Sequence, residues 1–248
     1  MLVTSSLLSQ LPGVVHGFTT RHGGCSHGPL SSLNLAWDRG LADDNEENWR
    51  RVKKHVGWSS SPVAVVHQVH GIGVWKAQPN GTPLCPQADS DAVWTDRTHE
   101  LVAVRTADCV PILIAGPSVV LAVHAGWRGT AQGIVSHAVA EICRQLHCEP
   151  AELVAAIGPC ISVDRYEVGE DVVAGIAQRV DESVFVRRTT PRPHVDLKAA
   201  NAQLLRDAGV QHIDVLPHCT HTDSDFFSHR RDGVQTGRMA SFIGRVST

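Results

Sequence analysis

The chain has 248 residues, of which 42% are hydrophobic and 19% are charged, so it can bury a sizeable core and is not a disordered protein. Its net charge of −3 comes from 22 basic and 25 acidic residues without a long run of either sign, which argues against a nucleic-acid-binding protein. The fifteen histidines are an unusually large number, and histidine is both a common metal ligand and an acid or base near neutral pH.

The seven cysteines are scattered, odd in number and without a C-x-x-C pair, which favours reduced thiols over a secreted disulfide framework. The amino terminus has no basic leader, and no apolar run is long enough to span a membrane, so we expect a cytoplasmic protein without a membrane partner. Since no repeat, low-complexity stretch or linker interrupts the sequence, we expect a single domain over residues 1–248.

Hydrophobic periodicity and turn residues predict the secondary structure. Taken in chain order, the predicted elements are helix 45–56, strands 63–66, 101–105, 110–115 and 119–123, helix 130–146, strand 153–157, helix 168–180, strand 184–186, helix 197–208, and strands 213–216 and 239–246. Asp43 or Asp44 is the expected cap of the first helix and Gly57 its stop. The Pro/Gly-rich segment 78–87 indicates a surface loop.

Several predicted strands are apolar on successive residues, which indicates that both of their faces are covered. Such strands mixed with helices indicate an α/β protein, with either one mixed sheet or two packed sheets and helices outside. Periodicity alone does not choose between these two arrangements.

Three potential metal ligands follow or end predicted strands. His70 comes after strand 63–66, Cys109 lies in RTADCVPILIA, and His124 ends the strand in VVLAVHAGWRG. Because strand ends meet at one edge of a sheet, two imidazoles and a thiolate can bind zinc and leave a fourth position open, as in catalytic zinc sites. The alternatives are an inert buried cysteine and a structural histidine, and His67 competes with His70 because both lie in VVHQVHG.

Glycine-rich turns place arginines where an anion can approach the backbone. Arg21 in TTRHGGCSHGPL and Arg128 in HAGWRGT are therefore candidate contacts to phosphate or ribose. In the tail, Arg230 and Arg231 stand beside Asp232, which suggests a turn between strands with charge available for an anion. A surface ion pair or a solvated hairpin is the alternative interpretation in each case.

The motifs together resemble one known family. They are VHGFTTRHGG, SSLNLA, HQVHG, RTADCVPILI, AVHAGWRGT, AIGPCI followed by YEVGEDV, DLKAANAQLL, and SHRRDGVQTGRMASFI. This set is similar to the YfiH family, whose members are described as polyphenol oxidase or laccase domain proteins, purine nucleoside phosphorylases and peptidoglycan editing factors. The resemblance runs from about Val15 to Phe242.

The resemblance implies a four-layer α/β/β/α sandwich with mixed sheets, a CNF/YfiH-like fold. It implies that His70, Cys109 and His124 are the catalytic zinc ligands, which selects His70 over His67. The implied reaction joins adenosine, inosine or S-methyl-5'-thioadenosine with phosphate to give a free base and a pentose 1-phosphate, with adenosine deamination alongside. Arg21, Asn34, Arg128 and Arg231 are the expected substrate-binding residues, and the protein is expected to be a monomer or homodimer.

Two alternatives concern the same residues. Two histidines and one cysteine are also the ligands of a blue-copper site, so a copper-dependent polyphenol oxidase is possible, although the chain contains no H-x-H pair of the kind expected in a multicopper cluster. In the second alternative, Cys109 is a nucleophile activated by His124 in a hydrolase that edits a cell-wall precursor. Further motif positions could line the pocket or brace the fold, namely Asn34, Cys160, Tyr166, Asp196, Asn201 and Cys219.

Overall fold

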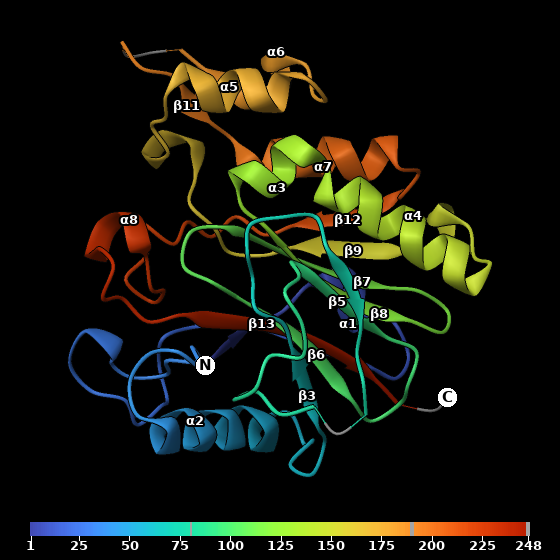
Figure 1. Ribbon diagram of the computed structural model, residues 1–248, viewed down its shortest axis with the longest axis vertical. Coiled ribbons are helices and arrows are strands. Elements are labelled where there is room, and N and C mark those ends of the chain that lie inside the picture. Colours follow the sequence, from blue (N-terminus) through green and yellow to red (C-terminus); the bar gives the residue numbers. More distant parts are fainter. Residues whose placement is uncertain (80, 189–190, 247–248) are drawn as a thin grey trace.

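Two mixed β-sheets form the centre of the computed structural model, which describes residues 1–79, 81–188 and 191–246 (Figure 1). The five-stranded sheet has the order β1 (Leu2–Val3), β2 (Val14–Thr19), β13 (Met239–Arg245), β6 (Leu101–Thr106) and β3 (Val63–Val65). The six-stranded sheet has the order β12 (His212–Val215), β9 (Val154–Ile157), β7 (Val110–Ala115), β8 (Val120–Ala125), β5 (Ala92–Thr95) and β4 (Val74–Lys76). Most neighbouring strands are antiparallel, while β3–β6, β4–β5 and β9–β12 are parallel.

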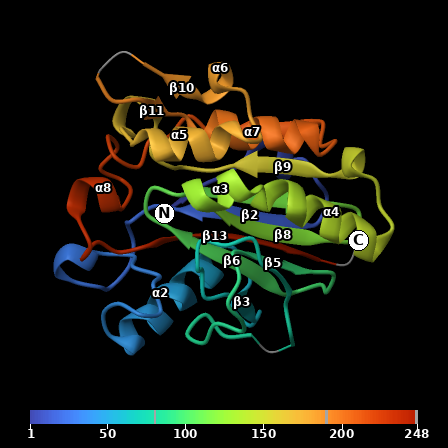
Figure 2. The ribbon, with the colours of Figure 1, turned by 45° about the horizontal axis from the view of Figure 1, so that its top comes forward.

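Helices cover the outer face of each sheet (Figures 1 and 2). Helix α2 (Ala42–His55) lies against the five-stranded sheet, and the six-stranded sheet is covered by α3 (Trp127–Gln132), α4 (Ile134–Leu146) and α7 (Leu197–Asp207). Beyond α3 and α7 lie α5 (Glu170–Ala177), α6 (Glu182–Phe185) and the ribbon of β10 (Val186–Arg187) and β11 (His194–Val195). The shorter helices are α1 (Ser6–Ser9), α8 (His229–Asp232) and the 3-10 turns Gly28–Leu30, Pro150–Glu152 and Val163–Arg165.

The side chains of β7 explain why its sequence is apolar at every position. Ile112 and Ile114 belong to the core between the six-stranded sheet and its helices, whereas Leu113 and Ala115 belong to the core between the two sheets. Successive residues of a strand point to opposite faces, so a strand buried on both faces needs an apolar residue at each position. The continuous runs thus reflect two covered faces, as predicted.

Three hydrophobic cores separate the layers. Trp49 and Val52 of α2 pack with Phe242 on the outer face of the five-stranded sheet. The inter-sheet core contains Leu113, and the helical side of the six-stranded sheet packs against residues of α4, α5 and α7. This order of layers confirms the predicted α/β/β/α sandwich. Among the described residues, no helix is both long enough and apolar enough to cross a membrane.

The predicted helices are present, with differences at their ends. Helix α2 begins at Ala42, so neither Asp43 nor Asp44 is the cap. Both lie in the first turn, where their negative charges interact favourably with the helix dipole. The predicted helix 130–146 is two helices, because Gly133 adopts a left-handed conformation (φ 80°) that ends α3 before α4 begins. Periodicity did not reveal this break, since both pieces bury apolar residues on the same sheet.

Two local predictions were wrong because capping side chains favour helix. The predicted strand 184–186 is mostly α6, whose Asp181 cap accepts a hydrogen bond from the Ser183 amide, and β10 begins only at Val186. The predicted turn between strands around Arg230 and Arg231 is the short helix α8, capped in the same way by Ser228. The prediction also omitted β1, β2, β4, β5 and β11.

Candidate metal centre and pocket

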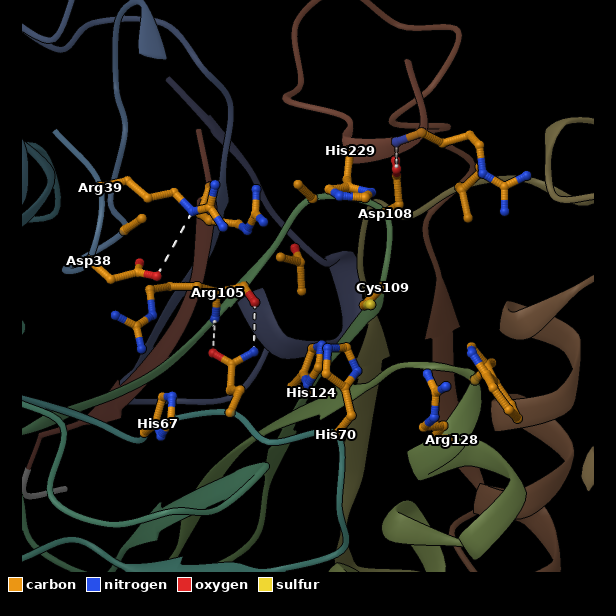
Figure 3. Close-up of a pocket in the computed structure, with 18 of the residues that line it drawn as sticks. Asp38, Arg39, His67, His70, Arg105, Asp108, Cys109, His124, Arg128 and His229 are labelled. Carbon is orange, nitrogen blue, oxygen red and sulfur yellow. Dashed lines mark hydrogen bonds and ion pairs between the residues drawn. The ribbon is translucent and has the colours of Figure 1, made fainter. Parts of the chain in front are cut away.

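Three distant segments bring His70, Cys109 and His124 together. Cys109 lies in the turn between β6 and β7, and the register of β7 with β8 pairs Pro111 with His124, so the two ligands lie at the same end of neighbouring strands. His70 arrives on the loop after β3. The potential ligand atoms of the three residues all lie within 4.8 Å of one another, and Figure 3 shows the two imidazoles side by side near the cysteine sulfur.

Asp91 holds two of these three residues in place. Its Oδ1 accepts hydrogen bonds from Nδ1 of His124 (2.8 Å) and from the His70 amide (3.0 Å). Its Oδ2 accepts from the amides of Gly71 (2.6 Å) and Val69 (3.2 Å), and its carbonyl accepts from the His124 amide (2.7 Å). Because Nδ1 of His124 is bound in this way, Nε2 is the nitrogen that is free for a ligand.

The two imidazoles of the cluster differ in charge, so a metal ion would have to displace the proton of His124. Although burial alone would lower the pKa of His124, the charge of Cys109 and the hydrogen bonds to Asp91 and Cys109 raise it to about 9. Burial of the His70 ring and repulsion from His124 lower the pKa of His70, so this imidazole is neutral at neutral pH. Burial would raise the pKa of Asp91, but the hydrogen bonds from His124 and the backbone amides lower it overall. An ionised Asp91 therefore orients His124.

Two unusual backbone conformations occur within the cluster and next to it. His70 (φ 60°) and Asp108 (φ 98°) both lie in the left-handed region, which is uncommon for residues other than glycine. Asp91 fixes the first through three successive amides. The second is fixed by Thr220, whose hydroxyl donates to Asp108 Oδ1 (2.6 Å), and by the Arg230 amide, which donates to Oδ2 (2.6 Å). Strain at such positions persists only where the surroundings determine the conformation, and here it lies next to two candidate ligands.

Gly126 makes room for the cluster. A Cβ atom at this position would lie 2.7 Å from Nδ1 of His70 and 3.3 Å from the sulfur of Cys109. The approach therefore requires glycine. Two imidazoles, one thiolate, a carboxylate partner for one imidazole and space around the donors fit a three-ligand metal site with an open position.

The cluster opens into a cavity of about 490 Å³ with a strongly cationic lining. Five arginines contribute to its wall, namely Arg39, Arg105, Arg128, Arg230 and Arg238, against the two carboxylates of Asp38 and Asp108. Figure 3 shows Arg39 and Arg105 on one side of the two imidazoles and Arg128 on the other. Two of the arginines make cation–π contacts. The Arg128 guanidinium lies 4.3 Å from the Trp127 ring centre, and that of Arg230 lies 5.1 Å from the Tyr166 ring centre.

Of the predicted substrate-binding residues, Arg128 lines this cavity, and the other three are not among its lining residues. Nε of Arg21 donates to the Ser31 carbonyl, and its guanidinium stacks on Phe227. Arg231 donates to backbone carbonyls of residues 220–226 and to Asp232. Asn34 is buried and bonds the Arg39 carbonyl and the Arg238 amide. Arg21, Asn34 and Arg231 therefore hold neighbouring backbone in place, and their role in substrate binding stays a prediction.

The other motif positions divide in the same way. Tyr166 lines the cavity, whereas Asp196 caps α7 and Asn201 joins α7 to Thr130 of α3. Cys160 and Cys219 pair across an isolated β-bridge, and all seven cysteines are free thiols. The sequence did not single out Asp91, which lies buried against His124, or the cavity-lining residues Arg39, Arg105 and Arg238. An arginine inside the apolar strand LVAVRT was the one available signal for Arg105.

The fold and the site together define an α/β/β/α sandwich protein with a candidate His/Cys/His metal centre in an arginine-rich pocket. Residues 15–246 match the family described as "Multi-copper polyphenol oxidoreductase laccase". A purine nucleoside phosphorylase of Deinococcus radiodurans is 42% identical over 237 residues, which cover 93% of this chain and 89% of that protein. Purine nucleoside phosphorylase YlmD of Geobacillus stearothermophilus is 38% identical over 250 residues, covering 94% and 90%.

Solved structures agree with these sequence matches. The crystal structure of YlmD from Geobacillus stearothermophilus has a TM-score of 0.87 at 36% identity, over 95% of this chain and 93% of that one. The Neisseria meningitidis protein NMB0706 has a TM-score of 0.86 at 34% identity, over 99% of both chains. The chain belongs to the laccase-like YfiH family, as its motifs indicated.

Proposed function

We propose that this protein is a zinc-dependent purine nucleoside phosphorylase that also deaminates adenosine. Its proposed substrates are adenosine, inosine and S-methyl-5'-thioadenosine with phosphate, and its products are a free base and a pentose 1-phosphate. The observation that carries the proposal is the position of the His/Cys/His cluster inside a cavity lined by five arginines. Relatives named purine nucleoside phosphorylase cover about nine-tenths of this chain, which supports the assignment.

We assign the metal ligands to His70, Cys109 and His124, with Asp91 orienting His124. Bound zinc would supply a Lewis acid with one open position. Copper is the alternative that the family description names, since the same donors occur in blue-copper sites. Among the described residues no second group of three potential ligands exists, and the sequence lacks H-x-H pairs, which supports zinc over a multicopper cluster.

In phosphorolysis, a phosphate oxygen forms a bond to C1′ of the sugar while the bond from C1′ to the purine nitrogen breaks, and the proton that the phosphate loses passes to the departing base. The arginines of the cavity would hold the phosphate and neutralise its charge. Burial raises the pKa of Tyr166 to about 12, so its hydroxyl keeps its proton and can donate a hydrogen bond to the substrate. Deamination would use the same cavity to hold the purine while water replaces the amino group as ammonia leaves.

Base release measured by chromatography tests the proposal. Metal-analysed protein is incubated with inosine or adenosine, with and without phosphate, and is compared with Cys109→Ala and with Cys85→Ala, whose cysteine is exposed and lies outside the cluster. We expect phosphate-dependent release of hypoxanthine or adenine, one zinc per chain, and a loss of at least about 100-fold in Cys109→Ala only. Equal release by Cys109→Ala would refute the proposal, and an intense blue colour with stoichiometric copper would favour the oxidase.

A second candidate function rests on the neighbours of His124. Its imidazole bonds Asp91 through Nδ1 and lies within 4.8 Å of the Cys109 sulfur, which is the order of nucleophile, base and orienting carboxylate in a Cys–His hydrolase. In that case Cys109 would attack a cell-wall precursor directly and would hold no metal. Rapid alkylation of Cys109 in metal-replete protein would favour the hydrolase, whereas protection of Cys109 by zinc would favour the phosphorylase.

The remaining assignments follow from the proposed chemistry. The partners are then small molecules, a purine nucleoside and phosphate, with no membrane or nucleic acid involved. We propose that the single domain acts in the cytoplasm as a monomer or homodimer. Size-exclusion chromatography with light scattering distinguishes these two states.

A further inference from the structure

Three guanidinium groups converge on one side of the pocket, away from Arg128. Arg105 is near the end of β6 and Arg238 immediately precedes β13, and the register of these neighbouring strands pairs Arg105 with Ala240. The pairing brings both arginines to the same end of the five-stranded sheet. Arg105 precedes Cys109 by four residues. Arg39 joins them on the loop before α2, and Figure 3 shows it on the same side as Arg105.

Arg105 is a buried cation with an unused donor. Its side chain is 7% exposed, and Nη2 donates to the Val66 carbonyl (2.8 Å), whereas the buried Nη1 has no hydrogen-bond partner within the described residues. Burial and the charge of Arg238 lower the pKa of Arg105 to about 10, so it stays charged at neutral pH. A buried, charged and unpaired donor is costly in a protein interior unless a ligand satisfies it.

The other two arginines have free donors as well. Nη1 of Arg39 donates to the Val234 carbonyl, but its buried Nε has no hydrogen-bond partner in the described chain and lies 3.9 Å from Asp38. Nη1 of Arg238 donates to the carbonyls of Thr236 and Gly237, and its other nitrogens remain for a ligand. Burial and the neighbouring Arg39 lower the pKa of Arg238, which shows that these cations repel one another.

Backbone contacts fix the three arginines in this arrangement. Gln68 binds the backbone of Arg105 on both sides, through its amide nitrogen to the carbonyl (2.7 Å) and through its oxygen to the amide (2.8 Å). Asn34 bonds the carbonyl of Arg39 (2.9 Å) and the amide of Arg238 (3.0 Å), so one buried side chain sets the spacing of two cations. Hydrogen bonds to the backbone therefore hold three mutually repelling guanidinium groups close together, which is the arrangement expected of an anion site.

We propose that Arg39, Arg105 and Arg238 form a subsite that binds a phosphate group beside the His70, Cys109 and His124 cluster. Three guanidinium groups against the one carboxylate of Asp38 leave two positive charges, which a phosphate dianion neutralises. Donors from three separate segments suit a tetrahedral anion, because a carboxylate needs only one bidentate arginine. The identity of the anion as phosphate rests on the proposed function, whereas the convergence of the arginines does not.

Calorimetric titration of the purified, metal-replete protein with inorganic phosphate at constant ionic strength tests this subsite. We expect Arg105→Gln and Arg238→Gln to weaken phosphate binding by about 10- to 100-fold, because each loses charge-assisted hydrogen bonds. Arg144→Gln is the matched control, since this exposed arginine pairs with Glu141 on the surface of α4, and it should bind as the wild type does. If Arg105→Gln does not fold, Arg238→Gln and Arg105→Lys carry the test.

Two further arms identify the source of the phosphate group. Inosine and inosine 5′-monophosphate are titrated in the same way. Free phosphate as the ligand predicts that inosine binds equally well to wild type and Arg105→Gln and does not displace phosphate. A phosphorylated substrate predicts that the monophosphate binds at least about tenfold more tightly than inosine in the wild type, displaces phosphate, and loses this advantage in Arg105→Gln.

Unchanged phosphate affinity in folded Arg105→Gln and Arg238→Gln would overturn the subsite, and so would phosphate binding that disappears only in Cys109→Ala. The outcome is separable from the proposed function. Base release with an unchanged KM for phosphate in both arginine variants refutes the subsite alone. Arginine-dependent phosphate binding without any base release refutes the phosphorylase and leaves the subsite.

Discussion

Asp91→Asn tests whether the carboxylate behind the cluster positions the metal ligands. Each oxygen of Asp91 accepts two hydrogen bonds, and the side chain is fully buried. Asparagine has nearly the same shape but replaces one oxygen with an amino group. Whichever oxygen is replaced, the new amino group faces two hydrogen-bond donors that lose their acceptor. His124 also loses its charged partner.

The magnitude follows from these contacts. Hydrogen bonds to a charged group contribute about 1.5–3 kcal/mol each, and breaking a buried ion pair costs about 3–5 kcal/mol, so we expect a loss of about 3 kcal/mol in the free energy of unfolding. For a chain of this size that loss corresponds to a Tm decrease of roughly 6–12 °C. Removing the partner of a metal-binding histidine lowers metal affinity by about 10- to 100-fold.

Two measurements separate positioning from simple stability. Competition with a chromophoric chelator reports zinc affinity at a temperature where the variant is folded, and circular dichroism reports Tm. Asp89→Asn is the control, because Asp89 pairs with the exposed His67 and its side chain is 75% exposed. A lower Tm with zinc affinity within threefold of wild type would show that Asp91 only stabilises the fold, and our assignment of a positioning role would be wrong.

Three further predictions concern other parts of the structure. Burial lowers the pKa of His16 to about 4, so His16 binds a proton at a higher pH in the unfolded chain than in the folded protein. The free energy of unfolding should therefore decrease by roughly 2–3 kcal/mol between about pH 6.5 and pH 4. Urea unfolding of His16→Gln should lack this pH dependence. Gly126→Ala should weaken zinc binding at least about tenfold, because the added methyl group would collide with His70. The control is Gly175→Ala in α5, where the methyl group meets ordinary contacts and should stabilise the protein by about 0.5–1 kcal/mol. Equal zinc affinity in both variants would contradict the close approach of Gly126 to His70. Leu113→Ala should cost about 2–5 kcal/mol by opening a cavity between the sheets, measured as a Tm decrease against the control Leu41→Ala at a 70% exposed position; similar Tm values would argue against the inter-sheet core.

The sequence by itself determined the elements whose burial leaves a pattern. Strands such as β7 are apolar at every residue because both faces are covered, and α4 repeats its apolar residues at helical spacing because one face lies on a sheet. The three candidate ligands were also readable, since each follows or ends an apolar strand. The choice of His70 over His67 and of two sheets over one came from the family motifs, because spacing alone leaves both open.

Only the tertiary structure decided what surrounds the cluster. Asp91 bonds residues 20 to 33 positions away, and Arg238 meets Arg105 because β13 returns beside β6 at the end of the chain. Local sequence carries no information about such neighbours. Arg21, Asn34 and Arg231 were predicted to bind substrate, and the structure adds that each bonds backbone groups of neighbouring segments. Hydrophobic periodicity reports which face of an element is buried, while the partners of a buried charge depend on which segments the fold brings together.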